Sequence, residues 1–199
     1  MISKFIPVYL ATFASAMGKL KDLRQTNFSN LQNKPACFPD TYYSYDWSFV
    51  PSGSKEENGV SHGVWYLYGL EPSNWDQSVE RCASIETYSY IASIRSQQEQ
   101  DGLATFLKLN NPPNCAYWLG GISFSTHTKW YWFSNDDAIT PMDYTNWWYD
   151  YPKTDGDDCA YMSQDSSNSC GYSWSNGYGC ATSYNHQNIP FGYICEIRC

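Results

Sequence analysis

The chain has 199 residues, enough for one domain with its own core and too few for two ordinary domains. Aromatic residues make up 18% and charged residues only 16% of it, and its formal net charge is -8. Binding to the phosphate backbone of nucleic acid needs clustered lysine and arginine, so this acidic chain is not expected to bind nucleic acid.

The N-terminal stretch predicts secretion. Residues 1–16 contain the cation Lys4, a short apolar run and the small-residue pattern Ala14-Ser15-Ala16, which is typical of a signal peptide and its cleavage site. The alternative is a membrane anchor, but roughly 20 apolar residues are needed to cross a bilayer, and this run is shorter. We therefore expect a secreted, extracellular protein without a membrane span.

Residues 17–63 are interpreted as a polar and aromatic N-terminal leader ahead of the main domain, which is predicted at residues 64–199. The leader carries one N-glycosylation acceptor, Asn27 in the sequence N-F-S, which indicates surface exposure. Residues 17–36 lack sustained heptads, so no coiled-coil stalk is expected.

The main domain opens with a strand and a helix. The run VWYLYGL at 64–70 is apolar and of strand length. Ser73 stands three residues before Asp76 in an acidic capping box, which predicts a helix start there. Apolar residues then recur at helical spacing and place Cys82 on the buried face of that helix.

A second strand and helix follow. The segment YIASI is a strand candidate, and Ser96 with Glu99 forms a second capping box. The apolar face of this helix is expected at Leu103, Phe106 and Leu107. The sequence NNPP at 110–113 should end the helix, because proline cannot continue it.

The rest of the chain has the pattern of strands and loops. Five short strands are predicted, in the sequences AYWLGGISF, KWYWF, DCAYM, CATSY and FGYICEI. Residues 141–158 form a long stretch without helical periodicity. Two early helices and many late strands predict an α+β domain.

Eight cysteines form an even set, which in an oxidising compartment predicts four disulfides: Cys37, Cys82, Cys115, Cys159, Cys170, Cys180, Cys195 and Cys199. A zinc site would favour tightly paired cysteines, such as C-x-x-C. The closest spacing is that of the last two cysteines, and no histidine lies near them.

Six segments, in this order, resemble a C-type lectin-like domain over about residues 64–199: WDQSVERC, IASIRSQQEQ, YWLGG, KWYWF with YTNW, DDCAYM and YICE. The resemblance implies an α+β C-type lectin-like fold. Such a fold has two helices with short antiparallel sheets, a long ligand-binding loop and disulfides that staple it together.

The resemblance also implies disulfide pairs, namely Cys82 with Cys195 and Cys159 with Cys180. The pairing of the other four cysteines stays open. The ends of such a fold lie close together, which favours the pair Cys37–Cys199 and leaves the pair Cys115–Cys170.

Sugar-binding members of the family hold calcium with a Glu-Pro-Asn or Gln-Pro-Asp triplet in the long loop and a Trp-Asn-Asp triplet on the next strand. Here the first triplet is Tyr151-Pro152-Lys153. A neutral phenol is a poor calcium ligand, and an ammonium group has no lone pair to offer. The second position has the sequence W-S-N-G, which retains only Asn176. The resemblance therefore implies a degenerate calcium site.

Acidic residues leave two interpretations of the loop open. Asp157 and Asp158 fall where the family has acidic groups and are the candidate metal ligands. Together with Asp150 and Asp155 they would form a displaced or weaker calcium site, since four carboxylates in one loop repel each other unless a cation lies among them. The alternative is a solvated acidic loop in which Lys153 neutralises one aspartate. Calcium is thus possible, and no cofactor is firmly implied.

The aromatic residues divide into two groups by their place in the family pattern. Core packing is expected of Trp118, Trp130, Trp132 and Trp147. The second group lies in or beside the long loop and either stacks on a ligand or packs the loop onto the domain: Trp148, Tyr149, Tyr151, Tyr172 and Tyr178. The candidate ligand-binding residues are Trp148, Tyr149, Asp150, Tyr151, Lys153, Asp155 and Asn176.

These patterns predict a secreted ligand-recognition module that binds glycans or glycoproteins. The alternative is a calcium-independent protein-binding domain of immune or venom type. No enzyme is expected, because the three histidines are scattered and no hydrolase or metalloprotease motif occurs.

Overall fold

A computed structural model describes residues 47–51, 63–110, 112, 116–124, 128–133, 139–155, 157–163, 172–184 and 188–198. All described residues lie in one compact unit, Pro35–Cys199. The predicted signal peptide, the glycosylation acceptor and four of the cysteines fall outside the described residues: 1–16, Asn27, Cys37, Cys115, Cys170 and Cys199.

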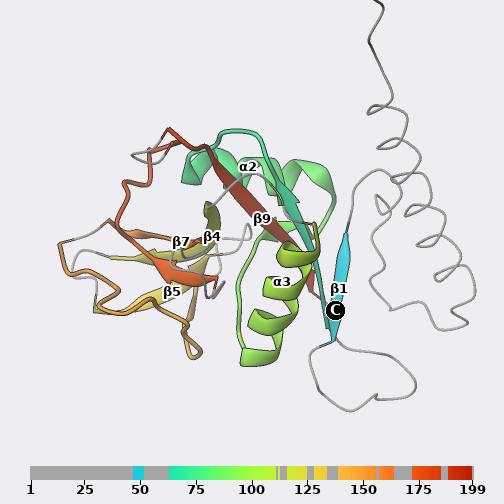
Figure 1. The fold of residues 1–199 in the computed structure, drawn as a ribbon, viewed down its shortest axis with the longest axis horizontal. Helices are drawn as coiled ribbons and strands as arrows, with labels where there is room; N and C mark the ends of the chain where they lie inside the picture. Colours follow the sequence, from blue (N-terminus) through green and yellow to red (C-terminus); the bar gives the residue numbers. More distant parts are fainter. Residues whose placement is uncertain are drawn as a thin grey trace, which may run out of the picture. The chain divides into compact units, whose positions relative to one another are not determined.

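The described residues form two helices and one mixed sheet of nine strands (Figure 1), so the predicted α+β fold is confirmed. In chain order the elements are β1 (Ser48–Pro51), β2 (Gly63–Gly69), α2 (Trp75–Ile85), β3 (Tyr90–Ile91), α3 (Gln97–Asn110), β4 (Ala116–Ser123), β5 (Trp130–Phe133), β6 (Ile139–Pro141), β7 (Cys159–Ser163), β8 (Ser173–Ser175) and β9 (Phe191–Arg198).

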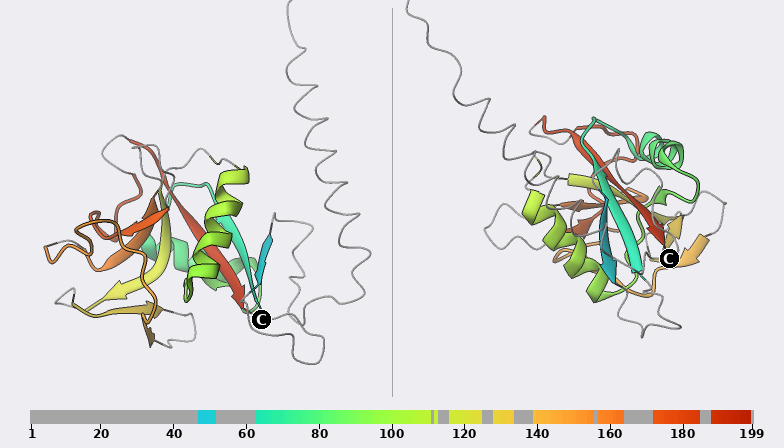
Figure 2. Two further views of the ribbon diagram at one scale, coloured as in Figure 1. Left: turned by 60° about the horizontal axis from the view of Figure 1, so that its bottom comes forward. Right: turned by 90° about the vertical axis from the view of Figure 1, so that its right-hand side faces the viewer.

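Strand β9 runs through the middle of the sheet, whose main path is β1-β2-β9-β4-β5-β6. Strand β3 also pairs with β9, and β7 pairs with both β4 and β8. Helices α2 and α3 lie on opposite sides of β2 and β9 (Figure 2). The pair β4–β9 is parallel, which corrects the expectation of purely antiparallel sheets. The long segment between these two strands accommodates the crossover that a parallel pair requires.

The sheet begins earlier than the expected domain boundary at residue 64. Strand β1 lies within the stretch interpreted as a leader, and it pairs antiparallel with β2 along its whole length. Trp47 and Val50 are buried there, and Val50 packs against Gly102 of α3. These apolar contacts give β1 a place in the core that its mixed local sequence does not reveal.

Helix α2 starts one residue later than the predicted capping box. The cap is Asn74, whose Oδ1 accepts a hydrogen bond from the Gln77 N–H at 2.9 Å, while Gln77 Oε1 accepts one from the Asn74 N–H at 3.1 Å. Asparagine caps a helix as well as serine does, so the prediction of Ser73 was wrong by one position. Cys82 lies on the buried face as predicted.

Helix α3 begins after Ser96, whose Oγ accepts a hydrogen bond from the backbone N–H of Glu99 at 3.2 Å. The reciprocal half of the predicted capping box is missing, because the Glu99 carboxylate accepts from the Arg95 N–H at 2.8 Å and from Arg198. The predicted apolar face is confirmed, since Leu103, Phe106 and Leu107 are all buried.

Near the C-terminus, one strand assignment was wrong and one strand was missed. The segment CATSY contains no strand and makes only an isolated bridge between Tyr184 and Pro190. Strand β8 was not predicted, because it is three residues long and two of them are serines. Its central residue, Trp174, is fully buried and contacts Trp132 at a ring-centroid distance of 5.3 Å. Core packing, rather than local pattern, makes this segment a strand.

Two disulfides join the described elements, and they are the pairs that the family resemblance implies. Cys82 and Cys195 link α2 to β9, and Cys159 and Cys180 link the start of β7 to the segment after β8. Of the four tryptophans expected in the core, three are buried and Trp147 is partly buried against it. Within the described part of the chain, no helix is long and apolar enough to cross a membrane.

Candidate functional site

A long loop, residues 142–158, connects β6 to β7 and is drawn in orange at the left of Figure 1. Both of its ends are tied to the sheet. At its start, the Met142 N–H donates to the Trp130 carbonyl at 3.0 Å. At its end, the Ser123 N–H donates to the Asp158 carbonyl at 2.8 Å, immediately before the disulfide at Cys159. The sheet therefore holds the loop as a projecting structure.

Trp147 anchors the middle of this loop in the core. Its ring contacts Trp130 at 4.7 Å and Trp174 at 5.8 Å between centroids. The backbone of Trp174 accepts from the Trp148 N–H and donates to the Asn146 carbonyl, each at 2.9 Å. This pairing directs Trp147 inward and leaves the residues that follow it in solvent.

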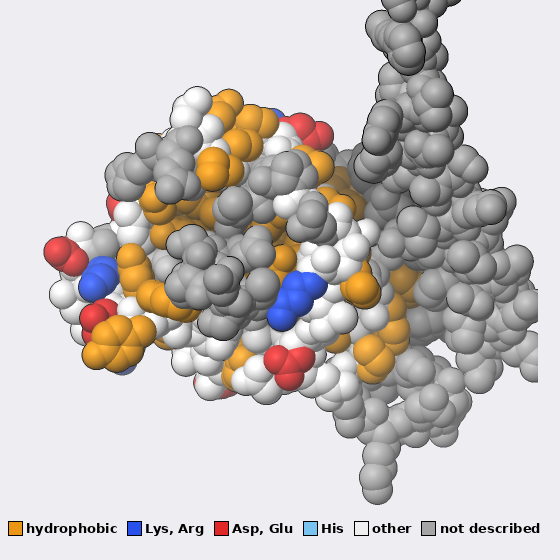
Figure 3. All heavy atoms as spheres, viewed as in Figure 1, with side chains coloured by type: hydrophobic (Ala, Val, Ile, Leu, Met, Phe, Trp, Pro, Cys, Tyr) orange, Lys and Arg blue, Asp and Glu red, His pale blue; other side chains and the backbone are white. Residues whose placement is uncertain are grey.

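The two residues after the anchor present aromatic side chains to solvent. Trp148 is 38% exposed and Tyr149 is 83% exposed. Asp150 follows in the left-handed region, at a φ of 63°, and the chain turns so that the Tyr151 N–H donates to the Trp148 carbonyl at 2.9 Å. Figure 3 shows acidic, basic and hydrophobic side chains together at the left-hand edge, where Figure 1 draws the loop. The turn thus displays aromatic and charged groups side by side.

The segment Tyr151-Pro152-Lys153 forms the far side of the loop, with a cis peptide bond before the proline. The Lys153 ammonium lies 5.2 Å from the centroid of the Tyr151 ring, a distance at which a cation is attracted to an aromatic face. The Tyr151 hydroxyl reaches across to Gly177. These contacts occupy the positions where sugar-binding family members carry calcium ligands.

Asn176 lies beneath the loop, and its side chain binds the loop backbone. Its Oδ1 accepts from the Lys153 N–H at 2.7 Å, and its Nδ2 donates to the carbonyls of Lys153 at 2.9 Å and Asp157 at 3.0 Å. Its own carbonyl accepts from the Asp157 N–H at 2.9 Å. Asn176 is fully buried, at 0% exposure. It supports the loop from below and does not lie on the surface with the other candidate ligand-binding residues.

The four aspartates considered as calcium ligands all face solvent: Asp150, Asp155, Asp157 and Asp158. Across the described ranges, no three His, Cys, Asp or Glu side chains come together as a group that could hold a metal ion. The Asn176 oxygen already accepts an N–H, and Lys153 carries an ammonium group. The donor set at the family's principal calcium position therefore does not fit that metal.

The sequence analysis left open whether the aromatic residues in and beside the loop contact a ligand or pack against the domain. The structure shows that two of them, Tyr172 and Tyr178, pack against the domain. Tyr172 is buried and belongs to the core cluster. Tyr178 packs against Tyr161 and Phe191 at centroid distances of 5.5 and 5.3 Å. Burial raises the pKa of Tyr161 well above its ordinary value, so its phenol stays neutral under this packing. Tyr161 and Phe191 thus hold Tyr178, and with it the segment after β8, in place.

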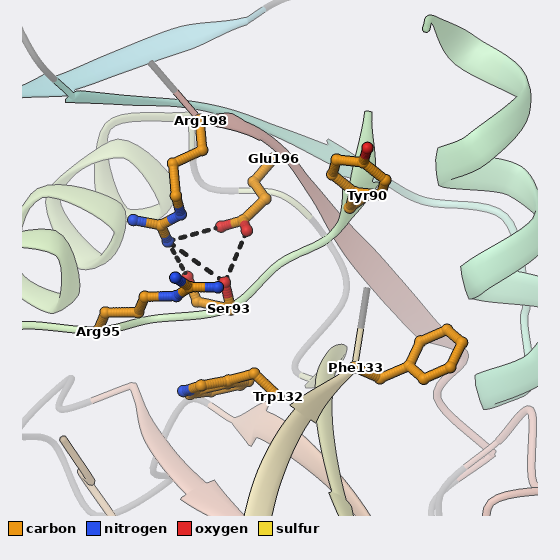
Figure 4. Close-up of a pocket in the computed structure, with 7 residues that line it drawn as sticks. All are labelled: Tyr90, Ser93, Arg95, Trp132, Phe133, Glu196 and Arg198. Carbon is orange, nitrogen blue, oxygen red and sulfur yellow. Dashed lines mark hydrogen bonds and ion pairs between the residues drawn. The ribbon is translucent and has the colours of Figure 1, made fainter. Parts of the chain in front are cut away.

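A separate recess of about 140 Å³ lies beside β3, β5 and β9 (Figure 4). Ser93, Glu196 and Arg198 face one another along one wall, and Trp132 lies on the other side. The Ser93 hydroxyl donates to Glu196 Oε1 at 2.6 Å, and Arg198 Nη2 lies 3.0 Å from Glu196 Oε2. The Ser93 hydroxyl, the Glu196 carboxylate and Arg198 Nη2 are thus paired with each other, whereas Arg198 Nε is buried without a hydrogen-bond partner among the described residues.

A second carboxylate completes this cluster from helix α3. Arg198 Nη1 lies 2.7 Å from Glu99 Oε1, and both glutamates are buried. Burial raises the pKa of Glu196, an effect that the neighbouring Arg198 partly offsets. Burial alone would lower the pKa of Arg198, but Glu196 and Glu99 raise it, so the guanidinium stays charged. This ion cluster is structural, and the sequence analysis missed it because Glu99 also fits a capping box.

Comparison with known proteins gives one family. The family model of the lectin C-type domain matches residues 71–196, more than half of the chain. A search of curated proteins finds no match.

Several solved structures share the fold. Human lithostathine aligns with a TM-score of 0.54 and 15% identity, covering 75% of this chain and 99% of its own. SPL-1, solved as a GlcNAc complex, aligns with a TM-score of 0.53 and 20% identity, and the alignment covers 68% of this chain and 88% of SPL-1. The cow C-type carbohydrate-recognition domain of CD23 was solved in the presence of a GlcNAc2Man3 oligosaccharide. It aligns with a TM-score of 0.50 and 21% identity, and the alignment covers 68% of this chain and 88% of the CD23 domain. At these identities the likeness establishes the fold.

Proposed function

The chain belongs to the C-type lectin family, and from that premise we propose that it is a secreted recognition module that binds carbohydrate through its long loop, with a degenerate calcium site. The role proposed is binding, not catalysis. The ligands are glycans, free or carried on glycoproteins.

The exposed aromatic turn at Trp148 and Tyr149 is the observation that carries this proposal. Aromatic faces stack on the apolar faces of sugar rings, and they do so without a metal. Asp150 and Lys153 stand within the same loop and offer an acceptor and a donor for sugar hydroxyls. Stacking combined with a few polar contacts is the usual composition of a small-ligand site.

The chemistry at the family's calcium position supports recognition without that metal. Lys153 brings a positive charge to it, and the Asn176 amide is already hydrogen-bonded to the loop backbone. Glycans as the ligand class are supported by the relatives, since SPL-1 was solved with GlcNAc and cow CD23 with an oligosaccharide.

Secretion is supported by the two disulfides, which persist in oxidising compartments. We propose cleavage of a signal peptide at residues 1–16, a leader that carries a glycan at Asn27, and an extracellular lectin domain after it. Further disulfides among the remaining four cysteines belong to the same proposal.

The experiment is a glycan array probed with the labelled, disulfide-intact protein in EDTA and again in calcium. We expect the same glycans to bind in both buffers. Trp148→Ala and Tyr149→Ala should each weaken binding by about tenfold or more, because they remove the stacking faces. The matched control is Tyr88→Asn, which removes an exposed aromatic ring outside the loop at a position of positive φ that asparagine tolerates.

Two results would overturn the proposal. Binding that appears only in calcium would show that a metal completes the site. An array without any bound glycan, obtained with protein whose fold is verified by circular dichroism, would refute carbohydrate recognition and leave protein recognition by the same loop.

A further inference from the structure

We propose that Asn176 is a positioning residue whose side-chain amide takes the place of a metal ion and holds the long loop in its binding conformation. This inference rests on the proposed function in one respect, namely that the long loop binds the ligand. The part that concerns the loop's conformation stands on hydrogen bonds alone.

The amide of Asn176 is almost fully used by two loop residues. Both Nδ2 hydrogens are donated, to the Lys153 carbonyl at 2.9 Å and the Asp157 carbonyl at 3.0 Å. Oδ1 accepts from the Lys153 N–H at 2.7 Å. A primary amide has two donors and one carbonyl acceptor, so every kind of hydrogen bond it makes is directed at this loop.

The position of Asn176 makes this contact rigid. It directly follows β8, whose Trp174 is fully buried and donates through its indole N–H to Gln100 Oε1 at 3.0 Å. Asn176 is itself fully buried, so its side of these part-buried hydrogen bonds is shielded from water, which makes them stronger than the same bonds in solvent. One side chain, that of Asn176, therefore fastens the far part of the loop, from Lys153 to Asp157, to the core.

The amide hydrogens do what a cation would do at this point. Two carbonyl oxygens, from Lys153 and Asp157, converge on the same Nδ2 atom. Calcium prefers such oxygen ligands, and here the positive edge of an amide lies among them instead. A loop held in this way is preorganised without metal, which lowers the conformational entropy lost when a ligand binds.

Asn176→Asp tests the substitution of amide for metal. It keeps the shape of the side chain and replaces the NH2 group with a carboxylate oxygen that faces two carbonyls. The three oxygens repel one another, and a hard divalent cation relieves that repulsion. In the variant, we expect the loop amides to lose protection from hydrogen exchange in EDTA and to regain it in calcium. In the wild type, their protection should be the same in EDTA and in calcium.

Amide hydrogen exchange by NMR gives the readout. In the wild type in EDTA, the N–H groups of Lys153 and Asp157 should both be protected. In Asn176→Ala both should exchange about tenfold faster or more. The Asp157 N–H is the decisive probe, because its acceptor is the backbone carbonyl of residue 176, which alanine retains. Asn146→Ala is the matched control, since that amide makes one long hydrogen bond of 3.3 Å to the Tyr172 carbonyl from the same loop.

The outcomes separate this inference from the proposed function. Unchanged Asp157 protection in Asn176→Ala, or no calcium response in Asn176→Asp, would overturn the inference even if glycans bind. Loss of protection together with an array that binds no glycan would uphold the inference and refute the proposed function. If the inference and the proposed function are both correct, Asn176→Ala and Trp148→Ala should each weaken glycan binding in EDTA. The amides of the loop should exchange faster in Asn176→Ala and should stay protected in Trp148→Ala.

Discussion

Arg198 Nη1 lies 2.7 Å from Glu99 Oε1, which joins the last residue of β9 to the first turn of α3 across 99 positions of sequence. The same guanidinium contacts Glu196 at 3.0 Å and the Ser93 carbonyl at 2.7 Å. One cation therefore pairs with two buried carboxylates and fastens a helix to the central strand.

Removing that cation should destabilise the fold strongly. In Arg198→Met the carboxylates of Glu99 and Glu196 stay buried without a cationic partner and keep only neutral donors, such as the Arg95 N–H and the Ser93 hydroxyl. Removing one partner of a buried ion pair typically costs about 3–5 kcal/mol; because Arg198 is partly exposed, we expect a loss of about 3 kcal/mol in the free energy of unfolding. Urea unfolding measures it. The control is Arg81→Met, whose ion pair with Glu71 is 3.9 Å long and largely exposed, so it should cost less than about 1 kcal/mol. Equal losses in the two variants would contradict the structural role of the cluster.

Gly102→Ala should destabilise the protein although alanine favours helices. A Cβ at Gly102 would overlap both methyl groups of Val50 on β1. Overpacking of this kind typically costs about 1–3 kcal/mol, which exceeds the gain of about 1 kcal/mol in helix propensity. The double variant Val50→Ala with Gly102→Ala makes room for the new methyl group. Thermal unfolding of the four proteins should therefore show favourable coupling, and strictly additive losses would disprove the contact.

The two disulfides should contribute unequally to stability. The Cys82–Cys195 bond closes a loop of 113 residues and the Cys159–Cys180 bond one of 21. In the chain-entropy model these closures contribute about 5 and about 3 kcal/mol. Replacing each pair with serines and measuring urea unfolding should show the larger loss for the first pair. Glycan binding should instead be more sensitive to the second pair, which lies at the base of the long loop; the reverse order on either measurement would refute this division.

Alkaline pH should weaken the fold in part through Tyr193. Burial, followed by the neighbouring Glu71, raises the pKa of Tyr193 to about 12, above its ordinary value of about 10. The neutral phenol is favoured in the folded state, so its contribution is complete below about pH 10 and is lost as pH rises through about 12. Between about pH 8 and about pH 11, the wild type should lose about 1 kcal/mol more than Tyr193→Phe.

Urea unfolding at both pH values tests this expectation. Other buried tyrosines, such as Tyr66, also have a raised pKa because of burial, but they are common to the two proteins and cancel in the comparison. Parallel losses in wild type and Tyr193→Phe would show that Tyr193 is not responsible.

Much of the fold followed from local pattern. The apolar face of α3 and the buried position of Cys82 were predicted because helical periodicity depends only on neighbouring residues. Strands β1, β6 and β8 were not predicted, because they are only three or four residues long and become strands only through the partners that the sheet provides. The cap of α2 shifted by one residue, because serine and asparagine are equally able to cap.

The chemistry of the candidate site was determined by the sequence alone. Tyr151 and Lys153 stand where calcium ligands would be, and no arrangement of the chain gives a phenol or an ammonium group the chemistry of a carboxylate. The role of Asn176 was decided only by the tertiary structure. Its partners lie 23 and 19 residues away along the chain, and Glu99 meets Arg198 over a still longer separation. Residue type sets what a side chain can bind, but its burial and the backbone groups around it come from packing between distant segments.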